Sequence, residues 1–138
     1  MTNELKNIKV LIADDELDIL EIMVKSVAKE GYTVIPAHDG LEAWEKIQSE
    51  NPDIILLDVT MPGMSGLEVL KNLRENPPTE KWQPVVIISA LGEMKDLEAG
   101  FSGEADHYIT KPCQMHDIIK GIRLMNNLIP LRKSRSEA

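Results

Sequence analysis

Short apolar runs recur along the chain, and most of them end at a polar or charged residue. In the run at 54–57, four apolar residues follow one another without the alternation of a half-exposed strand, which indicates a strand covered on both faces. Strands are predicted at residues 8–13, 32–35, 54–57, 85–88 and 108–110. Buried strands of this kind are typical of a parallel sheet with helices on both sides.

Between the runs, apolar residues recur at intervals of three and four positions, which is the spacing of amphipathic helices. The positions that predict five helices are Leu17, Leu20, Val24 and Val27; Leu41, Trp44 and Ile47; Leu67, Leu70 and Leu73; Leu91, Met94, Leu97 and Phe101; and Ile118, Ile122, Met125 and Ile129. Asp39 and Ser65 stand just before the second and third helices and are predicted N-caps. Gly31 is predicted to end the first helix and Pro130 the last.

Strand and helix therefore alternate five times, an order that demands a mainly parallel sheet with right-handed crossovers. We predict an α/β, flavodoxin-like, doubly wound (βα)5 fold whose five strands lie in the order 2-1-3-4-5. Residues 1–129 form the predicted domain, and residues 130–138 a polar, basic tail or linker stub. The Pro-rich stretch at 76–84 is predicted to be a surface loop.

Composition limits the classes of function. With 138 residues, of which 43% are hydrophobic, the chain can form one domain with a core but not a second domain of similar size. Its formal net charge of −8 disfavours direct binding of nucleic acid, which requires a clustered basic face. No apolar stretch approaches the roughly 20 residues that span a bilayer, and the chain begins with no signal peptide. The lone Cys113 fits a reducing interior, so we expect a cytoplasmic protein without membrane attachment.

Candidate chemistry lies where the predicted strands end. Asp14 and Asp15 follow the first strand, Asp58 the third, Ser89 the fourth and Lys111 the fifth. Because the carboxyl ends of parallel strands meet at one edge of a sheet, these side chains are expected to lie together. Two unit charges about 4 Å apart repel by roughly 4 kcal/mol at an effective dielectric of about 20, so three clustered acids require a cation. Ligation by oxygen alone suits Mg²⁺.

In this order and spacing, these residues resemble the receiver domain of two-component response regulators. The resemblance spans about residues 8–128 and includes the loop sequence MPGMSG after the third strand. It implies that Asp58 accepts a phosphoryl group from a sensor histidine kinase or a phosphotransfer protein in a Mg²⁺-dependent reaction. It also implies that Asp15, Asp58 and the backbone carbonyl of Thr60 ligate the metal directly, whereas Asp14 holds it mainly through water.

The resemblance assigns further residues to the phosphoryl group and to the switch that follows its transfer. Lys111 would pair with one phosphoryl oxygen, and the Ser89 hydroxyl with the backbone N–H of Ala90 would bind another. A cis bond between Lys111 and Pro112 would turn the lysine inward. Tyr108 would move inward with Ser89 and reshape the surface formed by the fourth helix, the fifth strand and the fifth helix.

That surface would be read by a downstream protein or a fused output domain, and it is also the expected interface of any homodimer. Two positions depart from the family pattern, since Glu104 stands in place of a common Gly and Cys113 in place of a common Phe. Neither residue belongs to the predicted chemistry.

Two other functions stay open on the sequence alone. A phosphatase of the haloacid dehalogenase type also has a nucleophilic Asp at a strand end beside Mg²⁺, but it requires an acid two residues later, where this chain has Thr60. A binding module that is independent of phosphorylation usually lacks the acceptor, an acid or the lysine, and this chain has them all. The favoured interpretation is a signalling domain that catalyses only its own phosphotransfer and autodephosphorylation.

Overall fold

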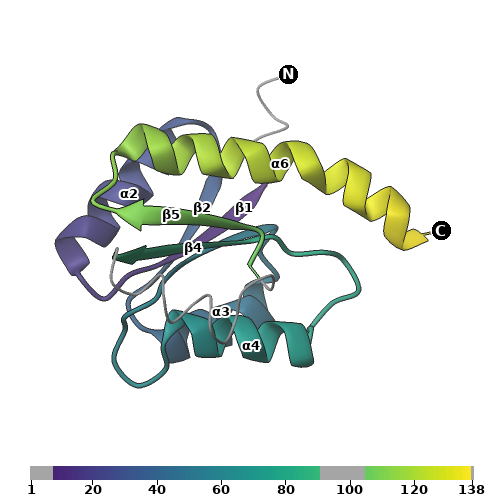
Figure 1. The fold of residues 1–138 in the computed structure, drawn as a ribbon, viewed down its shortest axis with the longest axis horizontal. Helices are drawn as coiled ribbons and strands as arrows, with labels where there is room; N and C mark the ends of the chain where they lie inside the picture. Colours follow the sequence, from purple (N-terminus) through teal and green to yellow (C-terminus); the bar gives the residue numbers. More distant parts are fainter. Residues whose placement is uncertain (1–7, 91–104, 138) are drawn as a thin grey trace.

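Five strands and four helices make up the part of the chain that the computed structural model describes, residues 8–90 and 105–137 (Figure 1). The elements are β1 (Lys9–Ala13), α2 (Leu17–Lys29), β2 (Thr33–Ala37), α3 (Gly40–Glu50), β3 (Ile54–Asp58), α4 (Gly66–Glu75), β4 (Val85–Ala90), β5 (His107–Lys111) and α6 (Met115–Glu137). The sheet order is β2-β1-β3-β4-β5 and all four pairings are parallel, which confirms the predicted fold. The helix predicted over 91–101 lies outside the described residues, as does Glu104.

The sheet separates two hydrophobic cores. Helices α3 and α4 cover one face and contribute to the first core, whereas α2 and α6 cover the other face and contribute to the second (Figure 1). Successive strand residues point to opposite faces, so Leu57 belongs to the first core and its neighbour Leu56 to the second. Every residue of β3 is buried, as expected for a strand at the centre of a doubly wound sheet.

Two predicted helix faces are partly wrong. The side chains that α2 buries are Leu20, Met23 and Val27, whereas Leu17 is 65% exposed. In α3, Leu41 is 55% exposed and Ala43 faces the core instead. Spacings of three and four fit more than one helix face, and the sequence pattern had joined residues of two adjacent faces.

Both predicted N-caps are confirmed. The Asp39 side chain accepts a hydrogen bond from the N–H of Glu42 at 2.7 Å, and Ser65 Oγ accepts one from the N–H of Glu68 at 3.2 Å. Each bond satisfies a backbone donor that has no partner within its own helix. The two caps fix where α3 and α4 begin.

Helix α6 does not end at Pro130 as predicted but continues to Glu137, with the proline inside it. Proline removes one backbone donor and crowds the preceding turn, which bends a helix without always ending it. The helix bends on its way to the C-terminus in Figure 1. Just before the proline, Leu128 and Ile129 pack against the second core, which supports the helix up to this point. The assignment of 130–138 to a tail or linker stays a prediction.

The stretch at 76–84 is a loop, but its end is not at the surface. Gln83 is buried, and its side-chain amide donates to the carbonyl of Pro52 at 2.8 Å. The Arg74 guanidinium bonds the Gln83 carbonyl at 3.1 Å and Asp106 at 2.8 Å. These bonds tie the loop to the start of β3 and to the residue before β5.

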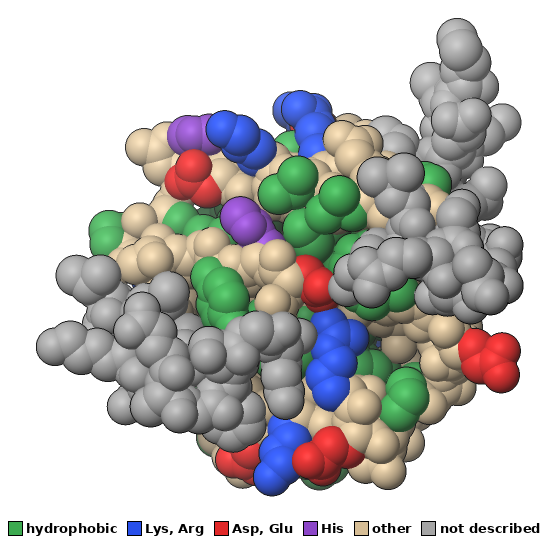
Figure 2. Space-filling view, turned by 45° about the vertical axis from the view of Figure 1, so that its right-hand side comes forward, with side chains coloured by type: hydrophobic (Ala, Val, Ile, Leu, Met, Phe, Trp, Pro, Cys, Tyr) green, Lys and Arg blue, Asp and Glu red, His purple; other side chains and the backbone are tan. Residues whose placement is uncertain are grey.

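On the face that Figure 2 shows, acidic and basic side chains are interspersed rather than gathered by sign. The described part of this face therefore presents no broad basic patch of the kind that binds a nucleic-acid backbone. Within the described ranges, none of the helices combines the length and apolarity needed to cross a membrane.

Candidate functional site

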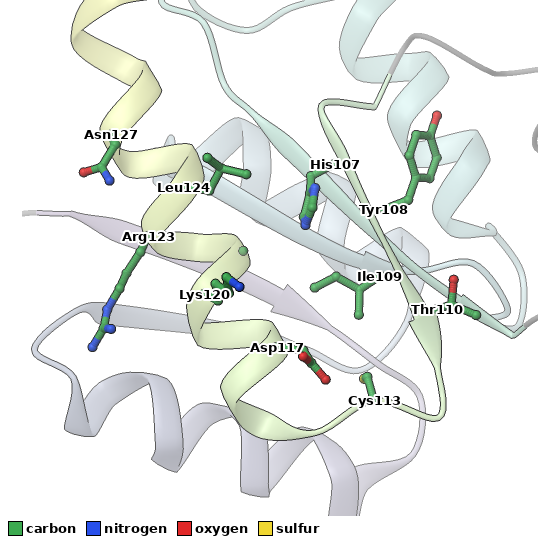
Figure 3. Close-up of a pocket in the computed structure, with 11 residues that line it drawn as sticks. His107, Tyr108, Ile109, Thr110, Cys113, Asp117, Lys120, Arg123, Leu124 and Asn127 are labelled. Carbon is green, nitrogen blue, oxygen red and sulfur yellow. The ribbon is translucent and has the colours of Figure 1, made fainter.

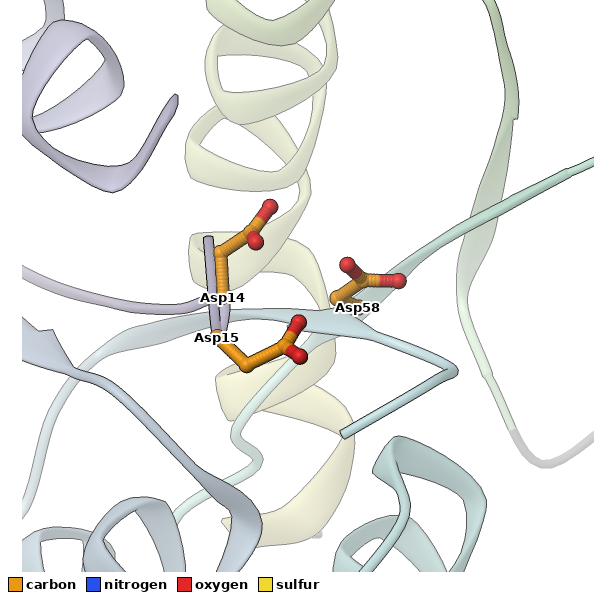
Figure 4. Close-up of side chains that lie close together, drawn as sticks. All are labelled: Asp14, Asp15 and Asp58. Carbon is orange, nitrogen blue, oxygen red and sulfur yellow. The ribbon is translucent and has the colours of Figure 1, made fainter. Parts of the chain in front are cut away.

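Three acids converge at the carboxyl edge of the sheet. Asp14 and Asp15 follow β1 directly, and Asp58 is the last residue of β3, the neighbouring strand. Figure 4 shows the three side chains gathered at this edge, and one carboxylate oxygen from each lies within 4.8 Å of the other two. Asp14 and Asp58 are buried, whereas Asp15 is exposed. The structure thus brings together the three acids that the sequence had placed at one site.

Lys111 completes the cluster from the end of β5. Its Nζ donates to Asp58 Oδ2 at 2.9 Å, across the end of the intervening strand β4. The Lys111–Pro112 peptide bond is cis, the isomer that the resemblance implied. One positive charge therefore lies against a group of three carboxylates.

Burial raises the pKa values of the two inner acids. The pKa of Asp14 rises to about 6, first because burial penalises its charged form and also because the charge of Asp58 is close. A hydrogen bond of 2.9 Å from the N–H of Glu16 to Asp14 Oδ1 opposes this rise. Burial also raises the pKa of Asp58, even though the bond to Lys111 favours its charged form. A nearby cation would stabilise the charged forms of both carboxylates.

The surroundings of Lys111 favour its ammonium form. Burial acts against the charge, but the bond to Asp58 and the charges of Asp58 and Asp14 outweigh it and raise the pKa of Lys111. The lysine thus stays charged at neutral pH. Because three acids lie near this one base, the electrostatics of the cluster favour binding of a cation. A cluster of carboxylates with oxygen ligands alone fits a hard divalent cation such as Mg²⁺.

An open cavity of about 330 Å³ lies over this cluster. Its lining residues are Asp15, Glu16, Asp58, Thr60, Ala90 and Lys111. Glu16 had not been predicted as a site residue, although a third acid directly after Asp14 and Asp15 was a visible signal. A larger apolar groove of about 560 Å³ lies between α2 and α6, and Asp14 and Lys111 of the cluster are among its lining residues.

The loop after Asp58 is held close to the strand end. The N–H of Thr60 donates to Asp58 Oδ1 at 3.3 Å, and the N–H of Gly66 donates to the Val59 carbonyl at 3.0 Å. A Cβ atom at position 66 would overlap the Asp58 carbonyl oxygen and lie 2.9 Å from its carbonyl carbon. Only glycine permits α4 to begin against the backbone of Asp58. This requirement depends on a tertiary contact, so the sequence alone could not reveal it.

Ser89 lies near this edge on β4, whereas Tyr108 is the second residue of β5, three positions before Lys111. Ser89 is fully buried and pairs in register with Thr110 of β5. Tyr108 packs against the first core, and its hydroxyl is buried without a hydrogen-bond partner among the described residues. Unlike Ala90, neither side chain lines the cavity over the acids. Neither side chain is therefore part of the acidic cluster itself.

A separate cavity of about 570 Å³ lies between β5 and α6 (Figure 3). His107 and Ile109 point from β5 toward α6, whereas Tyr108 points to the opposite side of the strand. On the helix, Lys120 and Leu124 lie along the rim. The cavity belongs to the surface that the sequence had assigned to output.

The fold and the site together define a receiver domain, with a parallel 2-1-3-4-5 sheet that carries an acidic pair, a buried strand-end aspartate and a lysine at one edge. The sequence profile of the response regulator receiver domain matches residues 10–123. The chain belongs to this family.

Among individual proteins, the chain is similar to response regulator MprA. It is 34% identical to MprA of Mycobacterium ulcerans over 131 residues, which cover 95% of this chain and 53% of that protein. MprA of Mycobacterium tuberculosis is 33% identical over 131 residues, with coverage of 95% and 54%. The chain thus spans about half the length of these curated relatives.

Solved structures give the same class. The receiver domain of Francisella response regulator 1452 is 33% identical and superposes with a TM-score of 0.76, covering 86% of this chain and 96% of that one. Response regulator TrrA of Thermotoga maritima, solved in complex with Mg²⁺-BeF, is 28% identical with a TM-score of 0.73, covering 86% and 98%.

Proposed function

We propose that this receiver domain accepts a phosphoryl group on Asp58 from a sensor histidine kinase or a phosphotransfer protein. The observation that carries the proposal is the bond of 2.9 Å between Lys111 Nζ and Asp58 Oδ2 within the acidic cluster. A buried carboxylate that faces both a lysine and a cation site is suited to receive a group with dispersed negative charge. The similar TrrA was solved in complex with Mg²⁺-BeF, which supports a site for a cation and a phosphoryl-like group in this chain as well.

Asp15, Asp58 and the backbone carbonyl of Thr60 would hold Mg²⁺ directly, and Asp14 would hold it through water. When bound, the metal neutralises the acids and part of the phosphoryl charge, which lowers the barrier to approach of the donor. Asp15 and Thr60 line the same cavity as Asp58, so a metal held by them would lie next to the acceptor.

In the transfer step, an Asp58 carboxylate oxygen forms a bond to phosphorus while the bond from phosphorus to the donor imidazole nitrogen breaks. Lys111 pairs with one phosphoryl oxygen, and the Ser89 hydroxyl and the Ala90 N–H bind another, so the chain contributes position and charge. Water later hydrolyses the acyl phosphate, which releases inorganic phosphate and regenerates the Asp58 carboxylate. On this proposal the chain catalyses only its own phosphotransfer and autodephosphorylation.

Movement of Ser89 toward the phosphoryl group would open space into which Tyr108 turns, and this would alter the surface around β5 and α6. The buried hydroxyl of Tyr108 has no hydrogen-bond partner among the described residues, which supports a second position for this side chain. The output would be a downstream protein or a fused domain, because the similar MprA proteins are about twice as long. A homodimer through this face and a cytoplasmic location complete the proposal.

The phosphatase alternative is disfavoured by Thr60, which lines the cavity two residues after Asp58 where that class needs an acid. The phosphorylation-independent alternative is disfavoured because Asp14, Asp15, Asp58 and Lys111 are all present and close together. Turnover of an external phosphate ester would favour the phosphatase. Stoichiometric self-modification would favour the receiver.

Mass spectrometry after treatment with acetyl phosphate and Mg²⁺ tests the proposal. We expect one added phosphoryl group in the wild type and none in Asp58→Asn, which keeps the side-chain shape but cannot form the acyl phosphate. EDTA should abolish labelling of the wild type. Full labelling of Asp58→Asn would refute the assignment of the acceptor.

A further inference from the structure

The corner between β2 and α3 contacts both halves of the acidic site without contributing a side chain to it. On one side, the N–H of Asp14 donates to the carbonyl of Ala37 at 3.1 Å. On the other side, Gly40 at the start of α3 lies against Met64 in the loop that follows Asp58. This corner, residues 37–40, thus touches both the acidic pair and the acceptor loop.

The approach of Gly40 to the loop leaves no space for a side chain. A Cβ atom at position 40 would overlap the carbonyl oxygen of Met64 and would lie 2.6 Å from its carbonyl carbon and 2.9 Å from its Cβ. Two of these atoms belong to the backbone, so a rotamer change cannot relieve the overlap. Either α3 or the loop would have to move.

Helix α3 is the more firmly held of the two. Its first turn is capped by Asp39 at 2.7 Å and closed by the bond of 3.0 Å from the Ala43 N–H to the Asp39 carbonyl, and Ala43 is fully buried. Among the described residues, the N–H of Met64 bonds to the Pro62 carbonyl of its own loop, and the Met64 sulfur accepts a long bond of 3.7 Å from the Asn72 amide. Added volume at position 40 would therefore displace the loop rather than the helix.

We propose that Gly40 is a positioning residue for the phosphoacceptor site: by admitting the loop backbone at Met64, it keeps Thr60 beside Asp58. Gly66 anchors the other end of the same loop against Asp58. Thr60, between the two anchors, lines the acidic cavity. The role of Thr60 as a metal ligand rests on the proposed function, whereas the effect of Gly40 on the loop rests on the contact itself.

Gly40→Ala tests this inference through two measurements on the full chain. In the metal-free protein, we expect the largest amide NMR shift changes outside α3 to fall on residues 59–66. In a calorimetric titration, we expect Mg²⁺ affinity to fall by about tenfold or more, because a small misplacement of a ligand is costly. Gly121→Ala is the matched control, since a Cβ there would meet only side-chain atoms of His107 and Ile109, at 3.3 Å. It should leave both the amide shifts of residues 59–66 and the Mg²⁺ affinity unchanged.

Val27→Ala controls for lost stability, because Val27 is fully buried in the core on the opposite face of the sheet. It should lower the melting temperature while Mg²⁺ affinity is preserved. Loop amides and Mg²⁺ affinity that stay unchanged in folded Gly40→Ala would overturn the inference. If Gly40→Ala does not fold in buffer alone, the same two measurements are made with an osmolyte such as trimethylamine N-oxide, which favours the folded state. Unchanged loop amides and Mg²⁺ affinity there would overturn the inference equally.

The test also separates this inference from the proposed function. A wild-type chain that binds Mg²⁺ but takes up no phosphoryl group would reject phosphoacceptance, while the comparison of Gly40→Ala with Gly121→Ala would still decide the positioning role. Normal phosphorylation of the wild type combined with an unmoved loop in Gly40→Ala would reject the positioning role alone.

Discussion

At the scale of single residues, burial makes the charged form of Asp14 unfavourable. Its side chain is 1% exposed, its pKa is raised to about 6, and it lies beside two further acids. Asp58 is also buried but has Lys111 as a partner, and Asp15 is exposed. Burial, more than repulsion between the acids, thus penalises the charged form of Asp14, and it raises the pKa of Asp58 as well.

We predict that Asp14→Asn stabilises the metal-free protein in a pH-dependent manner. The folded pKa of about 6 lies above the ordinary value of 3.8, so the folded wild type binds more protons than the unfolded chain between these values. Wild-type stability therefore falls as pH rises through this window. The variant does not lose this stability, because asparagine does not titrate. Its advantage in unfolding free energy should grow by up to about 3 kcal/mol between about pH 4 and pH 7.

Denaturant unfolding in EDTA at both pH values measures this difference. Asp15→Asn is the matched control, because it removes a neighbouring charge from an exposed position and should gain less. An advantage of Asp14→Asn that stays constant with pH would show that burial does not penalise the charged form of Asp14.

At the scale of elements, the sequence predicted features that neighbouring residues or the topology determine, and it did not predict features that depend on how separate elements pack. The caps at Asp39 and Ser65 were predicted because capping needs only a side chain and the helix that follows. The site acids and Lys111 were predicted because parallel topology fixes where strand ends meet. The close approaches of Gly40 and Gly66 were not predicted, since they depend on how separate elements pack.

Helix α6 shows a local rule that failed. Proline usually ends a helix, and the sequence alone could not reveal that the backbone stays helical on both sides of Pro130.

We predict that Pro130→Ala stabilises the protein by about 1 kcal/mol, less than the roughly 3 kcal/mol cost of proline in a straight helix interior, because α6 already bends. The replacement restores a backbone donor within a helix that continues to Glu137. Thermal unfolding with far-ultraviolet circular dichroism measures the change. Pro78→Ala, at an exposed position of the loop at 76–84, should give no gain. Equal melting temperatures for Pro130→Ala and wild type would mean that the restored backbone donor does not stabilise α6.

At the scale of the whole molecule, the sheet joins the site to both of its helical layers. Asp58 ends the fully buried strand β3, and the loop beyond it packs on α3 through Met64, whereas Lys111 leads into α6. Tyr108 packs against the first core while its neighbours His107 and Ile109 point toward α6. A change at the sheet edge can therefore reach two separate layers.

The division of the interior by the sheet also determines how mutations combine. Val27 and Leu70 are fully buried in different cores, whereas Val27 and Ile122 belong to the same core. In double-mutant cycles of alanine replacements, Val27 with Leu70 should be additive within about 0.5 kcal/mol, and Val27 with Ile122 should deviate by more than that. Chemical denaturation of the single and double variants gives both coupling energies, and strong coupling across the sheet would contradict the division. If the cores are energetically independent, substitutions can accumulate in the α2–α6 layer without altering the tolerance of the α3–α4 layer that supports the acceptor loop.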